Sequence, residues 1–217
     1  DAYTFTGETG TGETIMKAAA NGVRQVSLEL GGKNAGIVFA DCDMDKAIEG
    51  TLRSAFANCG QVCLGTERVY VQRPIFDEFV ARLKAGAEQL VLGPPDDATS
   101  NFGPLISLKH REKVLSYYQK AVEDGATVIT GGGVPDMPAE LAHGAWVQPT
   151  IWTDLKDDSA VVTEEIFGPC CHIRPFDSEE EAVALANSLP YGLASAIWTE
   201  NVTRAHRVAG QLEAGIV

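Results

Sequence analysis

The sequence of 217 residues has no long apolar run and is short of basic residues. Its apolar runs extend over only a few residues, far below the roughly 20 that a membrane-spanning helix needs. Seventeen lysines and arginines stand against thirty aspartates and glutamates, which gives a net charge of −13. Nucleic-acid binding depends largely on cationic contacts to phosphates. We therefore expect no membrane partner and no nucleic-acid partner.

Cysteine is also scarce, and its spacing is irregular. The five cysteines are Cys42, Cys59, Cys63, Cys170 and Cys171. An odd number without regular spacing is a poor disulfide framework and is typical of a reducing compartment, so we expect a cytoplasmic protein. Structural zinc normally takes four converging ligands at recognisable spacings. The sequence offers no such set, and we expect no metal.

The composition itself is that of a folded protein, with 45% apolar and 22% charged residues. A chain of this length can bury roughly 70% of its extended surface, which is enough for a real core. Strand-like residues stand at both ends, at 1–6 and 215–217. We expect both ends to continue into a larger protein.

Strand-like and helix-like segments alternate between these ends. The patterns predict strands at 24–30, 68–72, 127–130 and 194–199, and helices at 13–21, 75–90 and 178–187. Further helices are expected after Asp43, around 114–122 and after Asn201, and the stretch 131–144 is expected to be a surface loop. Alternating strands and helices are typical of an α/β fold with a mainly parallel sheet.

Glu29 is the first candidate for chemistry. It ends a predicted strand and precedes Gly31 and Gly32, which allow a sharp turn. Ligands of open α/β sheets collect at the carboxyl ends of strands, and a partly desolvated carboxylate there can act as a general base. The alternative is a solvated strand-end residue, and residue type alone favours that alternative because Glu is mostly exposed.

Cys63 is the second candidate. It lies in NCGQVCLGT, residues 58–66, between a predicted helix and a predicted strand. Most free cysteines are small buried apolar residues, but backbone N–H groups in a glycine-flanked loop can stabilise a thiolate. Cys59 directly follows the helix and is interpreted as a packing residue. The loop therefore indicates a reactive thiol at Cys63, with ordinary packing as the alternative.

Two other stretches have weaker patterns. TEEIFGP, residues 163–169, has two possible interpretations. It is either a plain connection between a loop and a strand, or a segment in which a carboxylate binds a sugar hydroxyl beside an aromatic ring. The glycines at 7, 10 and 12 differ from the G-x-G-x-x-G dinucleotide fingerprint, but they precede a helix N-terminus, where anions bind. The four histidines, at 110, 143, 172 and 206, lie in scattered contexts and are interpreted as surface or packing residues.

Taken together and in this order, these stretches resemble the NAD(P)-dependent aldehyde dehydrogenase superfamily. The matching residues are FTG at 5–7, LELGGKN at 28–34, GQVC at 60–63, EEIFGP at 164–169 and PYGLASAIWT at 190–199. The resemblance covers essentially the whole chain. Within the superfamily, NCGQVCLGTERVYV and PFDSEEEAVALAN are most similar to the 2-hydroxymuconic and 2-aminomuconic semialdehyde dehydrogenases, which act in the meta-cleavage breakdown of aromatic compounds.

The resemblance implies roles for matching residues. Cys63 would be the nucleophile, and Glu29 would be the general base. The cofactor, NAD with NADP as an open alternative, would be contacted by four residues: Glu165 on the nicotinamide ribose, Phe167 beside it, Gly31 near the nicotinamide and Gly7 facing the pyrophosphate. Glu8 departs from the family pattern, in which many members carry a small hydroxyl residue near the phosphate. A carboxylate there should repel the phosphate, so no contact is assigned to Glu8.

The resemblance also implies an architecture. Residues 31–217 would form an aldehyde-dehydrogenase-like catalytic domain, a mainly parallel sheet flanked by helices. Residues 1–30 would be the C-terminal part of a Rossmann-like NAD-binding domain. The full-length protein would be a homo-oligomer that oxidises a small aldehyde, while an Asn donor to the oxyanion and the strand that completes the oligomer sheet would lie outside these residues. The 217 residues alone would then be inactive.

Two alternatives from other function classes stay open. A cysteine hydrolase would also use a loop thiol, but it needs a partner histidine oriented by Asn or Asp, and no histidine context indicates one. A non-catalytic fragment or interaction module could keep the same fold. The gene sequence before Asp1 and an aldehyde-oxidation assay would separate these alternatives.

Overall fold

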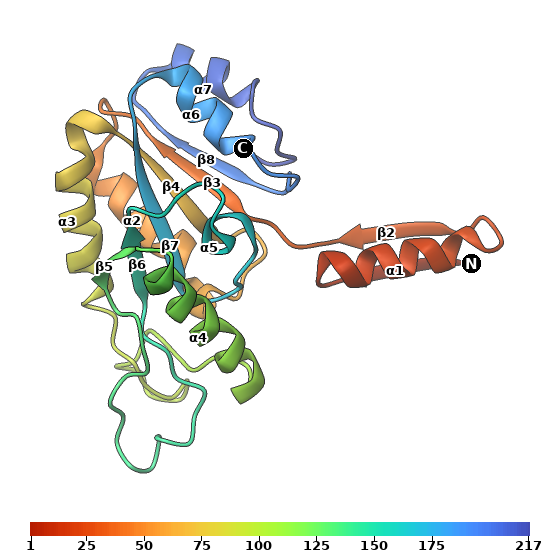
Figure 1. Ribbon diagram of the computed structural model, residues 1–217, viewed down its shortest axis with the longest axis horizontal. Helices are drawn as coiled ribbons and strands as arrows, with labels where there is room; N and C mark the ends of the chain where they lie inside the picture. Colours follow the sequence, from red (N-terminus) through yellow and green to blue (C-terminus); the bar gives the residue numbers. More distant parts are fainter.

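The computed structural model describes residues 1–217 and contains two separate sheets. The first consists of β1 (Ala2–Thr6), α1 (Thr9–Ala20) and β2 (Gln25–Glu29), with β1 and β2 paired in parallel. This projecting unit, residues 1–29, extends away from the rest of the chain (Figure 1). Leu30 to Lys33 connect it to the larger part, residues 34–217, which we call the body.

Helix α1 begins earlier than its sequence predicts. The sequence predicts a start at Glu13, after the glycines at 7, 10 and 12, but the helix already begins at Thr9. Gly12 is buried in it, and a Cβ atom there would lie 2.5 Å from Leu30 Cδ2. The glycine therefore allows the helix to pack closely on the connecting segment.

The body is built on a six-stranded sheet in the order β5-β6-β7-β4-β3-β8. Its strands are β3 (Asn34–Val38), β4 (Thr66–Gln72), β5 (Thr127–Thr130), β6 (Thr150–Thr153), β7 (Cys170–Phe176) and β8 (Ser195–Trp198). Every neighbouring pair is parallel except β5 with β6. The predicted α/β fold with a mainly parallel sheet is confirmed.

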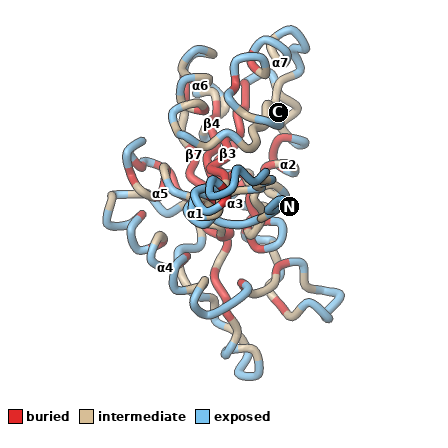
Figure 2. Tube along the Cα trace, turned by 90° about the vertical axis from the view of Figure 1, so that its right-hand side faces the viewer, coloured by how far each residue is buried: buried red, intermediate tan, exposed pale blue.

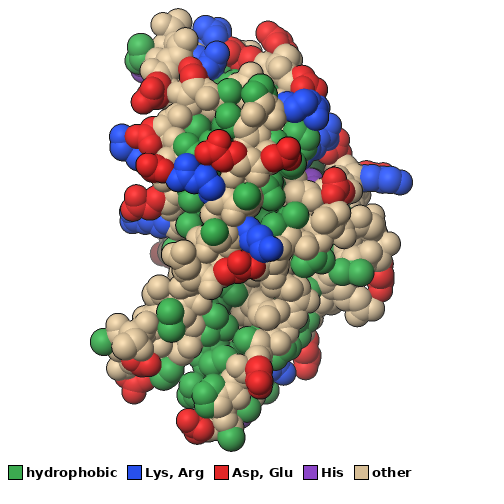
Figure 3. All heavy atoms as spheres, turned by 90° about the vertical axis from the view of Figure 1, so that its left-hand side faces the viewer, with side chains coloured by type: hydrophobic (Ala, Val, Ile, Leu, Met, Phe, Trp, Pro, Cys, Tyr) green, Lys and Arg blue, Asp and Glu red, His purple; other side chains and the backbone are tan.

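Helices cover both faces of this sheet. They are α2 (Met44–Phe56), α3 (Phe76–Ala87), α4 (Leu108–Glu123), α5 (Ala160–Thr163), α6 (Glu179–Ala186) and α7 (Val202–Ala209), with short 3₁₀ turns at Ala57–Gly60 and Arg73–Ile75. The larger core cluster contains residues of α2, α3 and α4, and the smaller one residues of α6 and α7. Figure 2 shows the buried strands between these layers. On the face in Figure 3, acidic and basic side chains are interspersed.

Polar caps fix several helix starts where the sequence indicates them. Asp43 accepts a hydrogen bond from the Lys46 N–H and begins α2, and Asn201 accepts one from the Arg204 N–H and begins α7. A capping side chain satisfies a backbone donor that has no partner inside the helix. In α4, Val114, Tyr118 and Ala121 are buried, whereas Val122 is exposed. No helix of the chain combines the length and the apolar character that crossing a membrane requires.

Candidate active site

A cleft of about 630 Å³ lies where the projecting unit meets the body. The structure brings six predicted site residues into its lining: Gly7, Glu29, Gly31, Cys63, Glu165 and Phe167. They come from the carboxyl end of β2, the turn after β1, and the segments that precede β3, β4 and β7. The volume is within the range of small-molecule sites.

The Cys63 loop is held in an unusual backbone path. Asn58, Cys59 and Gly60 have φ angles of 49°, 57° and 70°, a left-handed conformation that is rare for residues other than glycine. A Cβ at Gly60 would lie 2.0 Å from the Gly168 carbonyl oxygen. This close approach brings the loop before β4 against the loop before β7.

Hydrogen bonds also fix the loop on either side of the thiol. The Asn34 side-chain amide donates to the carbonyl oxygens of Cys63 and Gly65, each at 2.8 Å, and its oxygen accepts from the Ala194 N–H at 3.0 Å. Gln61 Oε1 accepts from the Ile106 N–H at 3.0 Å. The backbone at Cys63 is therefore positioned by β3, which makes the site precise rather than loosely placed.

The two cysteines of this loop differ in environment. Cys63 is partly exposed in the cleft, whereas Cys59 is buried and donates from Sγ to the Gly103 carbonyl oxygen at 3.0 Å. Burial raises the pKa of the Cys59 thiol, which disfavours its thiolate. Of the two thiols, Cys63 has the access that a nucleophile needs.

Glu29 lies at the end of β2 with its side chain exposed. Its backbone oxygen accepts a hydrogen bond from the Gly7 N–H at 3.0 Å, which joins the ends of β1 and β2. The exposed carboxylate corresponds to the solvated alternative for this strand-end residue and not to the partly desolvated one. In this chain, Glu29 therefore reaches the cleft from its solvent side.

Glu165 is half-buried in the lining of the same cleft. Its Oε1 accepts a hydrogen bond from the Gly32 N–H at 2.9 Å, and burial raises the pKa of its carboxyl group. A Cβ at Gly31 would lie 2.2 Å from Glu165 Oε2. The connecting segment therefore needs glycine at 31 to pass so close to this carboxylate.

Phe167 has a φ angle of 60°, and neighbouring side chains hold its strained backbone. His110 on α4 contacts the Phe167 carbonyl oxygen through Nε2 at 2.6 Å. Because a carbonyl can only accept, this Nε2 carries a proton and donates. The rings of the two residues also meet edge to face, with centroids 6.1 Å apart.

Sequence reasoning missed His110 and Lys113, which also line the cleft. Both lie on α4, and Lys113 Nζ donates to the Glu165 carbonyl oxygen at 3.2 Å. Their spacing of three residues places them on one helix face, but a helix with many charged surface residues gives no sign of which face meets a site.

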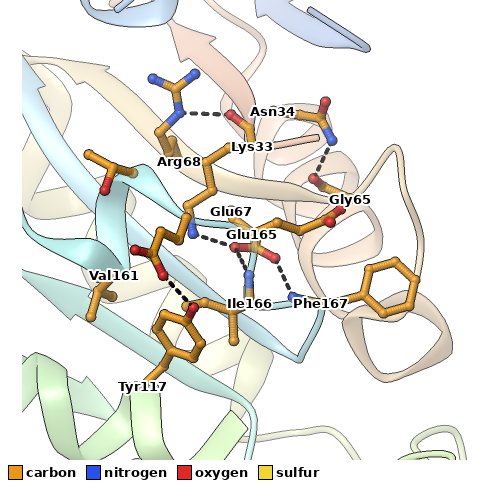
Figure 4. Close-up of polar contacts among 12 residues, drawn as sticks. Lys33, Asn34, Gly65, Glu67, Arg68, Tyr117, Val161, Glu165, Ile166 and Phe167 are labelled. Atoms are coloured by element: carbon orange, nitrogen blue, oxygen red, sulfur yellow. Dashed lines mark hydrogen bonds and ion pairs between the residues drawn. The ribbon is translucent and has the colours of Figure 1, made fainter. Parts of the chain in front are cut away.

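Lys33 and Glu67 form a buried ion pair behind the cleft that the sequence also did not reveal (Figure 4). They are only 1% and 7% exposed. Charged residues are almost never so buried unless they are paired, and their separation of 34 positions gives no pattern by which to pair them. No group of three or more His, Cys, Asp or Glu side chains converges to hold a metal ion.

The geometry thus combines a partly exposed thiol, a carboxylate at a strand end and a second, half-buried carboxylate, all around one cleft. A thiol in a fixed loop can attack an electrophilic carbon, and a solvent-side carboxylate can activate water.

The aldehyde dehydrogenase family matches the chain over residues 1–217. Two similar relatives are 2-hydroxymuconic semialdehyde dehydrogenase of Pseudomonas putida, 88% identical over the whole chain, and 2-aminomuconic 6-semialdehyde dehydrogenase of a Pseudomonas species, 55% identical over 99% of it. The chain spans 45% and 44% of their lengths.

A solved structure shows the same similarity at the level of the fold. Betaine aldehyde dehydrogenase of Staphylococcus aureus, crystallised in complex with NAD+, superposes with a TM-score of 0.97 at 40% identity. The match covers 100% of this chain and 43% of that one.

Proposed function

The chain belongs to the aldehyde dehydrogenase family, and on this premise we propose that the protein containing it oxidises an aldehyde to a carboxylic acid with NAD. The observation that carries the proposal is the single cleft that six family-matched residues line. A plain structural role for these residues would not require them to share one cavity, since they come from five separate segments of the chain.

We propose a muconic-type semialdehyde from aromatic meta-cleavage as the substrate. Support comes from the relatives: 2-hydroxymuconic semialdehyde dehydrogenases are 88% and 83% identical to the chain. The S. aureus betaine aldehyde dehydrogenase is 40% identical, which gives weaker support for an unrelated aldehyde.

The residues fit a nicotinamide dinucleotide. The glycine at 31 leaves the Glu165 carboxylate free to approach the connecting segment, where a side chain would fill the space. Glu165 would accept hydrogen bonds from the nicotinamide ribose with Phe167 beside it, Gly31 would adjoin the nicotinamide, and Gly7 would face the pyrophosphate. When bound, the dinucleotide accepts a hydride; NADP would use the same residues.

Cys63 carries the covalent chemistry in this proposal. Its thiolate attacks the aldehyde carbon to give a tetrahedral oxyanion, which the Cys63 backbone N–H stabilises as one donor. Loss of hydride from that carbon leaves a thioester on Sγ. Glu29 then takes a proton from a water molecule, the resulting hydroxide attacks the thioester, and the carboxylic acid and the thiolate are released.

The proposal assigns residues 1–30 to the C-terminal part of an NAD-binding domain and residues 31–217 to the catalytic domain. The two separate sheets support this division. On the family resemblance alone, it also includes a cytoplasmic, homo-oligomeric full-length protein. A cysteine hydrolase is disfavoured, because the one histidine in the cleft lining, His110, hydrogen-bonds the Phe167 carbonyl and makes no hydrogen bond to Cys63.

Replacing the thiol tests this function. In the full-length protein that contains these residues, Cys63→Ser should reduce NADH formation from 2-hydroxymuconic semialdehyde to background, because serine is a far weaker nucleophile at neutral pH. NADH binding, followed by its fluorescence, should be retained. Cys59→Ser is the matched control in the same loop and should keep most of the activity. Activity in Cys63→Ser together with an inactive Cys59→Ser would assign the chemistry to the other thiol.

A further inference from the structure

The turn Glu165–Phe167 is held almost entirely by side chains from elsewhere in the body. Glu67, in β4, accepts from the Ile166 N–H through Oε2 at 3.1 Å and from the Phe167 N–H through Oε1 at 2.8 Å. On α4, His110 donates to the Phe167 carbonyl and Lys113 to the Glu165 carbonyl. Glu67 is the one partner that binds two consecutive amides.

The position of Glu67 is costly for a carboxylate. It is 7% exposed, and its only cationic partner is Lys33, which is itself 1% exposed. Replacing such a buried pair by apolar residues of similar volume is often neutral or stabilising for a fold. Stability alone therefore gives little reason for this arrangement, whereas the two backbone amides give a specific one.

We infer that Glu67 is a positioning residue for the cofactor-contacting turn, a statement that rests on the function proposed above. Its ionised carboxylate holds the Ile166 and Phe167 amides, and this fixes the left-handed backbone at Phe167 and the place of Glu165 over the cleft. Hydrogen bonds to an ionised acceptor are about twice as strong as neutral ones. Lys33, one residue after Gly32, pairs with that carboxylate and ties the turn to the connecting segment (Figure 4).

Glu67→Gln keeps the shape of the side chain but removes its charge and one of its two acceptor oxygens. One amide oxygen can accept from only one of the two N–H groups at this site, and the NH₂ group opposes the other. Glu67→Gln alone leaves Lys33 without a counter-charge, which is strongly destabilising. The double variant Glu67→Gln/Lys33→Met removes that charge and keeps the loss at the turn, so it remains informative if the single variant does not fold.

Asp177→Asn provides the matched control. Asp177 follows β7 and pairs with Arg73, which follows β4. The Asp177→Asn substitution therefore removes a carboxylate that also links β4 and β7, but at the other ends of these strands and outside the cleft lining.

The first readout requires no bound cofactor or substrate. Amide hydrogen exchange of residues 164–169 in the full-length protein should become at least about tenfold faster in Glu67→Gln and in the double variant, because charged hydrogen bonds to both amides are lost. Asp177→Asn should leave the exchange of this segment unchanged. Unchanged exchange in the folded double variant would overturn the inference.

The second readout is the rate of hydride transfer in single-turnover kinetics with the semialdehyde. We expect a fall of about 10- to 100-fold in the double variant, since a displacement of about 1 Å at a reacting site has that effect. The NADH dissociation constant should change far less. Wild-type rates in the folded double variant would contradict the inference and show that Glu67 serves only as the counter-charge of Lys33. An inactive wild-type protein would instead refute the proposed function while leaving the exchange result valid.

Discussion

The projecting unit and the body meet at the same cleft, but they are built in opposite ways. In residues 1–29 only Gly12 and Ala19 are buried, whereas all five residues of β3 in the body are buried. The unit offers the carboxyl ends of its strands, with Glu29 at the end of β2. The body offers the amino ends, because Cys63 and Glu165 precede β4 and β7.

This difference indicates that the two regions supply different parts of the proposed chemistry. The proposed nucleophile, Cys63, lies on a loop that Asn34 and the contact with Gly168 fix to the core of the body. The proposed base lies on a two-stranded sheet, a kind of structure that is marginally stable by itself. The rule that ligands collect at carboxyl ends of strands therefore holds for the projecting unit only, and the short connecting segment sets how the two halves meet.

Between the two regions, the largest effect is expected from that connecting segment. In the full-length protein, Gly31→Ala should lower turnover by about 100-fold, because the added Cβ would stand 2.2 Å from Glu165 Oε2 and must displace either the carboxylate or the segment. Steady-state NADH formation measures this. Gly133→Ala, in the surface loop where a Cβ meets nothing closer than 3.5 Å, should be unaffected. Full activity in Gly31→Ala would mean that the two halves tolerate displacement.

A smaller effect concerns stability and compares the two regions directly. Ile37→Val removes one methylene group from a fully buried position in β3 and should lower the free energy of unfolding by about 1 kcal/mol. Val26→Ala removes two carbons from half-buried β2 and should change it by less than about 0.5 kcal/mol, because an exposed unit opens locally before the core does.

Urea unfolding followed by tryptophan fluorescence measures this difference. All three tryptophans, at 146, 152 and 198, lie in the body. An equal loss of stability in both variants would show that the projecting unit and the body unfold together, against the comparison drawn here.

Most helices and the α/β class were predictable from the sequence, because amphipathic stripes and capping residues such as Asp43 and Asn201 act locally. Strand β3 was not predicted. Its residues NAGIV are buried on both faces of a parallel sheet, so they show no alternation of apolar and polar residues. Strand β6, with four buried residues, gave equally little pattern.

The site was predictable where its residues form contiguous motifs, as around Cys63 and Glu165. Lys33, Glu67 and His110 could not be found in this way. Their roles depend on hydrogen bonds between segments 34 to 99 positions apart, and charged residues are by default expected on the surface. The exposure of Glu29 agrees with the default for its residue type, but the sequence left a partly desolvated carboxylate open, because exposure depends on what covers β2 and not on the strand itself.

Pre-steady-state kinetics of Glu29→Gln in the full-length protein test most directly whether the two regions divide the chemistry. If Cys63 in the body completes hydride transfer and Glu29 on the projecting unit activates water, mixing with semialdehyde and NAD should give one equivalent of NADH per active site and then a slow steady state. Intact mass spectrometry should show the acyl group on Cys63. Loss of the burst together with the steady state would place Glu29 before acylation, and full activity would show that this exposed carboxylate has no part in the reaction.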